Sequence, residues 1–205
     1  MSIIENPALK ASVARLGPEL TMAQVLIQRR GIGYELRHIQ DRDTATEFLH
    51  RLPLPEARPL AQYNAAGEFR PLKSAPDLRN GWLLSLANDT ELEIALNHLY
   101  PGALADWHAA QSPTPPVTNY REYTARQSGM YRITTMLSDS QVAEVVKTTC
   151  DKSRCLKQRL WTVPGMPADA PGAKSFIPCL EPCAVLMESA RTAMRAAQQE
   201  NAASS

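Results

Sequence analysis

The chain has 205 residues, 44% of them apolar, and a formal net charge of +1 at pH 7. This length predicts one or two domains with a core of ordinary size, and the balanced charge provides no general attraction to nucleic acid or to an anionic membrane. The apolar runs are too short to cross a bilayer, and the N-terminus lacks a signal-peptide pattern. We therefore expect a cytoplasmic protein whose thiols stay reduced.

Residues 1–111 have the pattern of a small α+β domain. Thr21–Arg30 has the apolar, branched side chains that are typical of a strand, and a turn at Gly31–Gly33 follows. Apolar and polar residues then alternate over Tyr34–Ile39, as in a second strand. Together these segments predict a hairpin. Asp43–Leu52 carries apolar residues at helical spacing and predicts a short helix that the following prolines end.

The rest of this first domain mixes extended and helical patterns. Gln62–Leu72 is expected to form two extended pieces around an Ala-Ala-Gly turn, and Trp82–Leu86 a strand. The pattern of Thr90–Tyr100 predicts an amphipathic helix whose N-terminus is capped by Asp89 or Thr90. Ala103–Gln111 predicts a second short helix.

Residues 112–118 (SPTPPVT) are rich in proline and predict a stiff linker between two domains. Residues 119–200 are expected to form a mainly helical domain, and residues 201–205 a disordered tail. Helices are expected over Asn119–Ser128, Ser138–Thr149 and Cys183–Gln199. A shaped loop is expected over Val163–Pro178.

All four cysteines lie in the last third of the chain, at positions 150, 155, 179 and 183. They read as C-x4-C and C-x3-C, two tight pairs separated by 23 residues. In a reducing compartment, such pairs favour a metal centre over disulfides. Four thiolates suit either a structural zinc ion or an iron–sulfur cluster.

Local details favour a [4Fe-4S] cluster, with zinc as the alternative. Neither pair has the two-residue spacing of a zinc knuckle, and Pro178 and Pro182 precede Cys179 and Cys183. Four protein thiolates would complete the coordination of the cluster and leave no iron open to substrate. Electron transfer, redox or iron sensing, and a structural role remain as functions.

Two further groups of residues are candidates for the surroundings of the cluster or for partner binding. Trp161 can wall the site, and Lys157 or Arg159 can offset the negative charge of the thiolates. Arginines interleave with aromatic residues at Arg121, Arg126 and Arg132. They could face the cluster, bind an anionic partner such as a tetrapyrrole, or form a solvated helix face.

Motifs of known catalytic classes are missing from the sequence. The four histidines form no metal-binding spacing, and no nucleophile elbow, dinucleotide fingerprint or Walker sequence is present. We therefore assign no catalytic residue and do not expect a stand-alone enzyme.

Several stretches resemble the accessory domains that are fused to a CbiX-type (sirohydrochlorin-chelatase-like) protein in some bacteria. One of these is a stabilising domain and the other binds a [4Fe-4S] cluster. The resemblance rests on residues 37–43 (RHIQDRD), 69–79 with Gly81-Trp82, 99–107 (LYPGALADW), 126–132 (RQSGMYR), and Cys150-x4-Cys155-Leu-Lys with Trp161. It implies that the four cysteines are cluster ligands, and it covers these accessory domains without the chelatase domain.

The resulting hypothesis is a [4Fe-4S] accessory protein linked to tetrapyrrole or metal-chelation metabolism. A protein partner such as a chelatase or reductase is expected, and nucleic acid or membrane is not. The alternative is a zinc-stabilised four-cysteine module that binds a protein or nucleic acid without redox activity.

Overall fold

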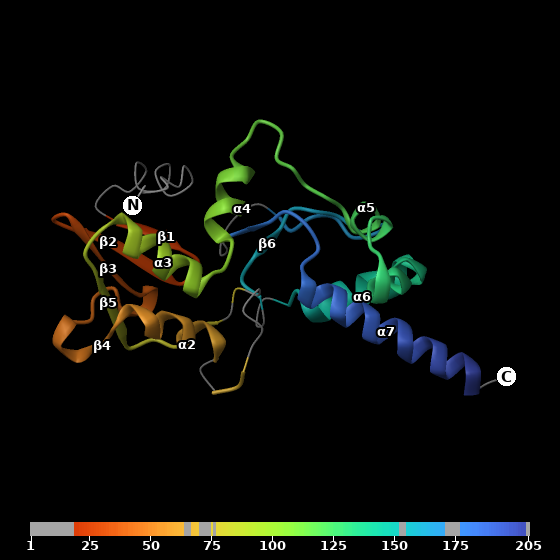
Figure 1. Ribbon diagram of the computed structural model, residues 1–205, viewed down its shortest axis with the longest axis horizontal. Helices are drawn as coiled ribbons and strands as arrows, with labels where there is room; N and C mark the ends of the chain where they lie inside the picture. The colour runs from red at the N-terminus through yellow and green to blue at the C-terminus, as the bar shows by residue number, and fades with distance from the viewer. Residues whose placement is uncertain are drawn as a thin grey trace.

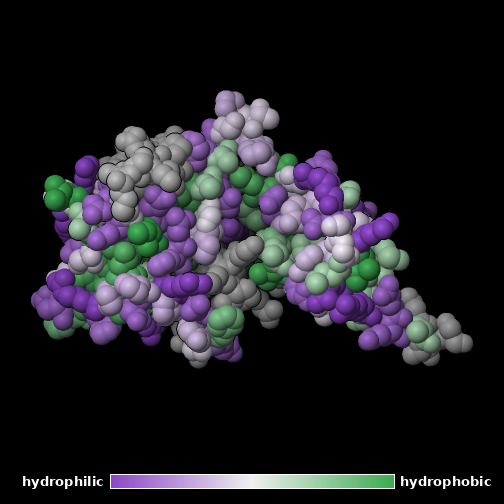
Figure 2. All heavy atoms as spheres, viewed as in Figure 1, coloured by the Kyte–Doolittle hydropathy of each residue, from purple (hydrophilic) through white to green (hydrophobic). Residues whose placement is uncertain are grey.

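The computed structural model describes residues 19–63, 67–69, 75, 77–151, 155–170 and 177–203. Its N-terminal half contains a five-stranded sheet with helices packed against it, and its C-terminal half is mainly helical (Figure 1). The expected α+β class is confirmed. Figure 2 shows mostly polar residues over one face of the molecule, with smaller apolar areas between them. Within the described residues, no helix is both long and apolar enough to span a membrane.

The sheet has the strand order β1-β2-β3-β5-β4. Its strands are β1 (Glu19–Met22), β2 (Val25–Arg30), β3 (Gly33–His38), β4 (His50–Leu52) and β5 (Trp82–Leu86). All pairs are antiparallel except β4 with β5, which are parallel. The expected hairpin around Gly31–Gly33 and the strand Trp82–Leu86 are both confirmed.

The single strand expected over Thr21–Arg30 is wrong, because the chain turns at Ala23–Gln24 and forms two strands. Ala23 has a φ of 49°, which a non-glycine residue adopts rarely. Gln24 holds the turn in place: its side-chain oxygen accepts a hydrogen bond from the backbone of Leu78 (2.7 Å). This partner is distant in sequence, so the local pattern gave no sign of the turn.

The helix expected over Asp43–Leu52 is also wrong. Only a short 3-10 turn, η2 (Thr46–Phe48), precedes β4, whose residues pair with Trp82–Leu84. Phe48 is 78% exposed, so the apolar spacing that suggested a helix does not mark a buried face. A helix forms later instead, at α2 (Ala57–Gln62), with Pro59 in its first turn.

Two helices complete the N-terminal half, α3 (Asp89–Leu99) and α4 (Ala103–Ala110), and both were expected. The cap of α3 differs from the expectation, because Asn88 accepts the hydrogen bond from the backbone of Glu91 (3.0 Å). Residues of α2, α3 and α4 share one buried core with the sheet. Tyr63 and Phe69 form an antiparallel bridge, and the rest of the expected pieces in 62–72 lies partly outside the described residues.

The C-terminal half packs helices around a second core. Its elements are α5 (Tyr120–Ala125), η4 (Gly129–Met136), α6 (Asp139–Thr149) and α7 (Ala184–Ala203). Helix α6 begins with a capping box of Ser138 and Gln141. Helix α5 is shorter than the helix expected over Asn119–Ser128, and η4 follows it. Because α7 ends at Ala203, residues 201–203 are helical where we expected a disordered tail.

A short parallel ladder links the cysteine-bearing segments. It joins β6 (Gln158–Arg159) to β7 (Pro178–Cys179), which flank the loop expected over Val163–Pro178 and overlap it only at Pro178. Ile177, directly before β7, is buried in the core of the N-terminal half. The ladder therefore lies where the two halves meet.

Candidate metal centre

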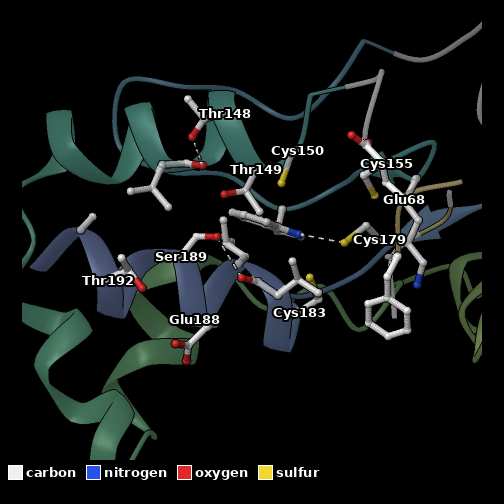
Figure 3. A pocket seen from close by; sticks show the side chains of 17 residues that line it. Glu68, Thr148, Thr149, Cys150, Cys155, Cys179, Cys183, Glu188, Ser189 and Thr192 are labelled. Carbon is white, nitrogen blue, oxygen red and sulfur yellow. Dashed lines mark hydrogen bonds between the residues drawn. The ribbon is translucent and has the colours of Figure 1, made fainter. Parts of the chain in front are cut away.

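The four cysteines line one cavity of about 700 Å³ (Figure 3). Cys150 is the C-terminal cap of α6, and Cys183 directly precedes α7. Cys179 ends β7, and Cys155 lies three residues before β6. Two helix ends and two strand segments therefore bring together thiols that are up to 33 residues apart (from 150 to 183).

The thiols are close enough to influence one another electrostatically. Burial, together with the charges of the other three cysteines, raises the pKa of Cys150 to about 12, while the charge of Arg159 acts in the opposite direction. Burial likewise raises the pKa of Cys179 to about 11, while a hydrogen bond from Trp161 and the charge of Lys157 act in the opposite direction. A metal centre binds thiolates, so it would have to replace these protons with positive charge.

Within the described residues, no three His, Cys, Asp or Glu side chains converge on a single-ion site. The cavity is lined by four cysteine thiols, and no disulfide joins any two of them. Four cysteine thiolates are the usual ligand set of a [4Fe-4S] cluster. The side chains around the cavity thus have the chemistry that such a cluster requires.

Three residues that follow Cys155 surround the thiols with hydrogen-bond donors and positive charge. The indole Nε1 of Trp161 donates to Sγ of Cys179 at 3.4 Å. Lys157 lines the cavity, and its charge favours the thiolate of Cys179. Arg159 is buried and favours the thiolate of Cys150. The sequence suggests Lys157 or Arg159 as a counter-charge, and the structure places both near cysteines.

The other three candidate residues, all arginines, do not line the cavity. Arg121 donates to the backbone oxygens of Thr135 (3.2 Å) and Leu137 (2.8 Å) and pairs with Asp139. It therefore holds α5 against η4 and the start of α6. Arg126 donates only locally, to the oxygen of Glu122 (3.2 Å), and is exposed, as is Arg132.

Several residues of the site come from the N-terminal half and were missed. Glu68 and Phe69 line the cavity, and Glu68 lies at the opposite end from Ser189 and Thr192 of α7 (Figure 3). Asp106 of α4 pairs with Lys157 at 3.1 Å. These residues lie between 49 and 87 positions before Cys155, and no local motif connects them to the cysteines.

A second cavity, of about 330 Å³, adjoins the first. Cys179, Cys183 and Lys157 line both cavities. The second cavity is also lined by Asp106 and Tyr123, so it lies between α4 and α5. These thiols can therefore be approached from two sides.

Comparisons with known proteins agree with this arrangement. Residues 8–111 match the family model of the DR2241 stabilising domain, and residues 112–192 match that of a 4Fe-4S iron-sulfur cluster binding domain. The second match indicates that the C-terminal half binds a [4Fe-4S] cluster. A search of curated proteins found no match.

One solved structure has a similar fold over nearly the whole chain. It is DR2241 from Deinococcus radiodurans, described as a multi-domain protein with structural similarity to chelatases and two additional novel domains. The sequence identity is 25% and the TM-score 0.76, over 93% of this chain. The chain spans 42% of the length of DR2241.

Proposed function

We propose that this chain, which belongs to the family of the DR2241 stabilising domain and carries a 4Fe-4S cluster binding domain, is an accessory protein that transfers or senses single electrons. The observation that carries this proposal is the meeting of all four thiols at one cavity. We propose Cys150, Cys155, Cys179 and Cys183 as the cluster ligands.

The residues around the cavity support a redox role for the site. A bound [4Fe-4S] cluster supplies a one-electron couple. The chain contributes buried apolar walls, such as Leu186, that limit the access of water. Trp161, Lys157 and Arg159 contribute hydrogen-bond donors and positive charge that stabilise negative charge on the thiolates and on a reduced cluster. Access from the second cavity supports electron exchange with a partner.

We further propose a partner in tetrapyrrole or metal-chelation metabolism, in the reducing environment of the cytoplasm. The support is the similarity to DR2241, which has structural similarity to chelatases. A chelatase or reductase would supply or receive the electron. The exposed Arg126 and Arg132 provide positive charge for an acidic partner surface or for the carboxylates of a tetrapyrrole.

Anaerobic purification followed by spectroscopy tests this function. The wild-type chain should show broad visible absorption that dithionite bleaches, together with an EPR signal of the reduced cluster. Thr149→Ser, a change beside Cys150 in the same cavity, should behave like wild type. A colourless protein with zinc bound after anaerobic reconstitution would overturn the proposal. A loaded cluster that no reductant reduces would reject its redox part.

A further inference from the structure

The segment that follows Cys155 presents three hydrogen-bond donors at alternate positions, Lys157, Arg159 and Trp161. The segment is extended, since the backbone of Gln158 donates to Ile177 (2.8 Å) and that of Leu160 donates to Cys179 (3.0 Å). Side chains at alternate positions of an extended strand lie on the same face. The three donors therefore lie on the same side of this extended segment, which we call the donor face, and Lys157 and Trp161 line the cavity of the cysteines.

Trp161 makes the most direct contact on the donor face. Its side chain is almost fully buried, at 1% exposure, and its Nε1 donates to Sγ of Cys179 at 3.4 Å (Figure 3). Hydrogen bonds to the ligand sulfurs stabilise the more negative state of an iron–sulfur cluster, because that state places more charge on sulfur.

Arg159 packs against Trp161 and fixes its position. The guanidinium donates to the backbone oxygen of Trp161 (2.6 Å) and lies 5.2 Å from the centroid of the indole ring. It also donates to the oxygen of Pro167 (2.6 Å) and pairs with Asp169 (3.4 Å). With these partners Arg159 has little freedom to move, so the indole that packs on it is held in one orientation.

Lys157 adds a positive charge beside the cysteines. Its side chain is 11% exposed and lines the cavity, and its ammonium pairs with Asp106 at 3.1 Å. Asp106 is more exposed, at 33%, so water screens the carboxylate more than the ammonium. The positive charge of Lys157 therefore remains beside the cysteines and favours negative charge in the cavity that it lines.

From this arrangement we infer that the donor face sets the reduction potential of the cluster by stabilising its reduced state. Trp161 acts through its hydrogen bond, Lys157 through its charge, and Arg159 as a positioning residue for Trp161. One electron from an external donor, dithionite in the test, adds one negative charge to the cluster, and no bond forms or breaks. The inference rests on the proposed function.

Potentiometric titration of the loaded full-length chain, followed by EPR, tests the inference with variants of opposite sign. Lys157→Met should make the potential more negative, whereas Asp106→Asn, which removes a negative charge beside the same ammonium, should make it less negative. Trp161→Phe should lower the ratio of reduced to oxidised cluster at a fixed potential by about threefold to tenfold, the effect of one net hydrogen bond. A purely structural role would not produce shifts of opposite sign across one ion pair.

Matched controls separate the donor face from general effects. Trp82→Phe removes another buried indole hydrogen bond, to the oxygen of Arg79, within the N-terminal sheet. Arg30→Gln removes an exposed positive charge from the same sheet. Both controls should leave the potential unchanged. Equal potentials in Lys157→Met, Asp106→Asn and wild type would overturn the inference, even if Trp161→Phe fails to fold.

The role of Arg159 requires a double-variant test. Arg159→Lys keeps the positive charge but loses the planar guanidinium that donates to several partners at once. It should therefore lower the reduction potential when Trp161 is present. In a chain that already carries Trp161→Phe, it should have no further effect on the potential. Additive shifts would contradict action through Trp161. A wild-type chain that binds no cluster would refute the proposed function itself, whereas a cluster that is reduced at the same potential in every variant would refute only this inference.

Discussion

The ammonium of Lys157 lies 3.1 Å from Oδ2 of Asp106, and this pair joins α4 of the N-terminal half to the segment that follows Cys155. The neighbouring Leu156 donates its backbone N–H to the oxygen of Ala75 (2.8 Å) and packs against the N-terminal core. Ile177, two residues before Cys179, is buried in the same core. The N-terminal half thus anchors the segments that carry two of the four cysteines.

This anchoring predicts that Ile177→Ala affects both stability and cluster retention. Loss of a fully buried isoleucine side chain should cost about 2–5 kcal/mol of unfolding free energy. The segment of Cys179 would also lose its anchor, so a chelator should remove the cluster several-fold faster. Urea unfolding and the rate of bleaching by a chelator measure the two effects.

Ile27→Ala is the matched control, because Ile27 is equally buried in the N-terminal core but lies on β2. It should destabilise the chain by a similar amount and release the cluster at nearly the wild-type rate under folding conditions. Equal release rates in the two variants would reject the anchoring role of Ile177.

Cys155→Ser should reduce cluster occupancy and destabilise residues 119–195 more than the N-terminal half. The physical reason is that a cluster binds the folded arrangement of thiolates and stabilises it by mass action. Hydrogen exchange with mass spectrometry resolves the two regions. Full occupancy in serine variants at all four cysteine positions would disprove the ligand assignment.

Arg121→Ala should destabilise the C-terminal half by about 1–3 kcal/mol, because it leaves the backbone oxygens of Thr135 and Leu137 without their charged donor. Arg126→Ala, on the same helix but exposed, should change the unfolding free energy by less than about 0.5 kcal/mol. Chemical denaturation measures both. Equal effects would show that Arg121 has no special structural role.

His38 should make the N-terminal half sensitive to mild acid. Burial lowers the pKa of His38 below its ordinary value of 6.5, although Asp41 and Asp77 act in the opposite direction. Since the unfolded chain then binds the proton more readily, stability is complete above pH 6.5 and is lost as the pH falls through the lowered pKa.

Thermal unfolding between pH 7.5 and 5 should show this loss in wild type and a smaller one in His38→Asn, which is destabilised at every pH but has no imidazole to protonate. His108→Asn, at an exposed position, should retain the wild-type pH dependence. An unchanged pH dependence in His38→Asn would assign the acid sensitivity to other groups.

The sequence predicted best those elements whose signals are local. The hairpin around Gly31–Gly33, the helix α3 and the capping box of Ser138 each have their defining residues within a few positions of one another. β4 could not be predicted in this way, because His50–Leu52 is extended only through its pairing with β5, about 30 residues later. Tertiary pairing there overrides the local apolar spacing.

The same distinction holds for the metal centre. The four cysteines and Trp161 could be selected from their spacing and adjacency. The contributions of Asp106, Phe69 and Ile177 could not, since they depend on how the two halves pack. The role suggested for Arg121 as a neighbour of the cluster fails because its side chain is already engaged with η4 and α6.

Anaerobic alkylation of the cluster-loaded chain, read by intact mass and peptide mapping, tests most directly whether one cluster is bound by all four cysteines. We expect all four cysteines to be protected in the loaded chain and to react once the cluster is removed and the chain is unfolded: Cys150, Cys155, Cys179 and Cys183. Rapid modification of any of these cysteines with the cluster still intact would contradict this expectation.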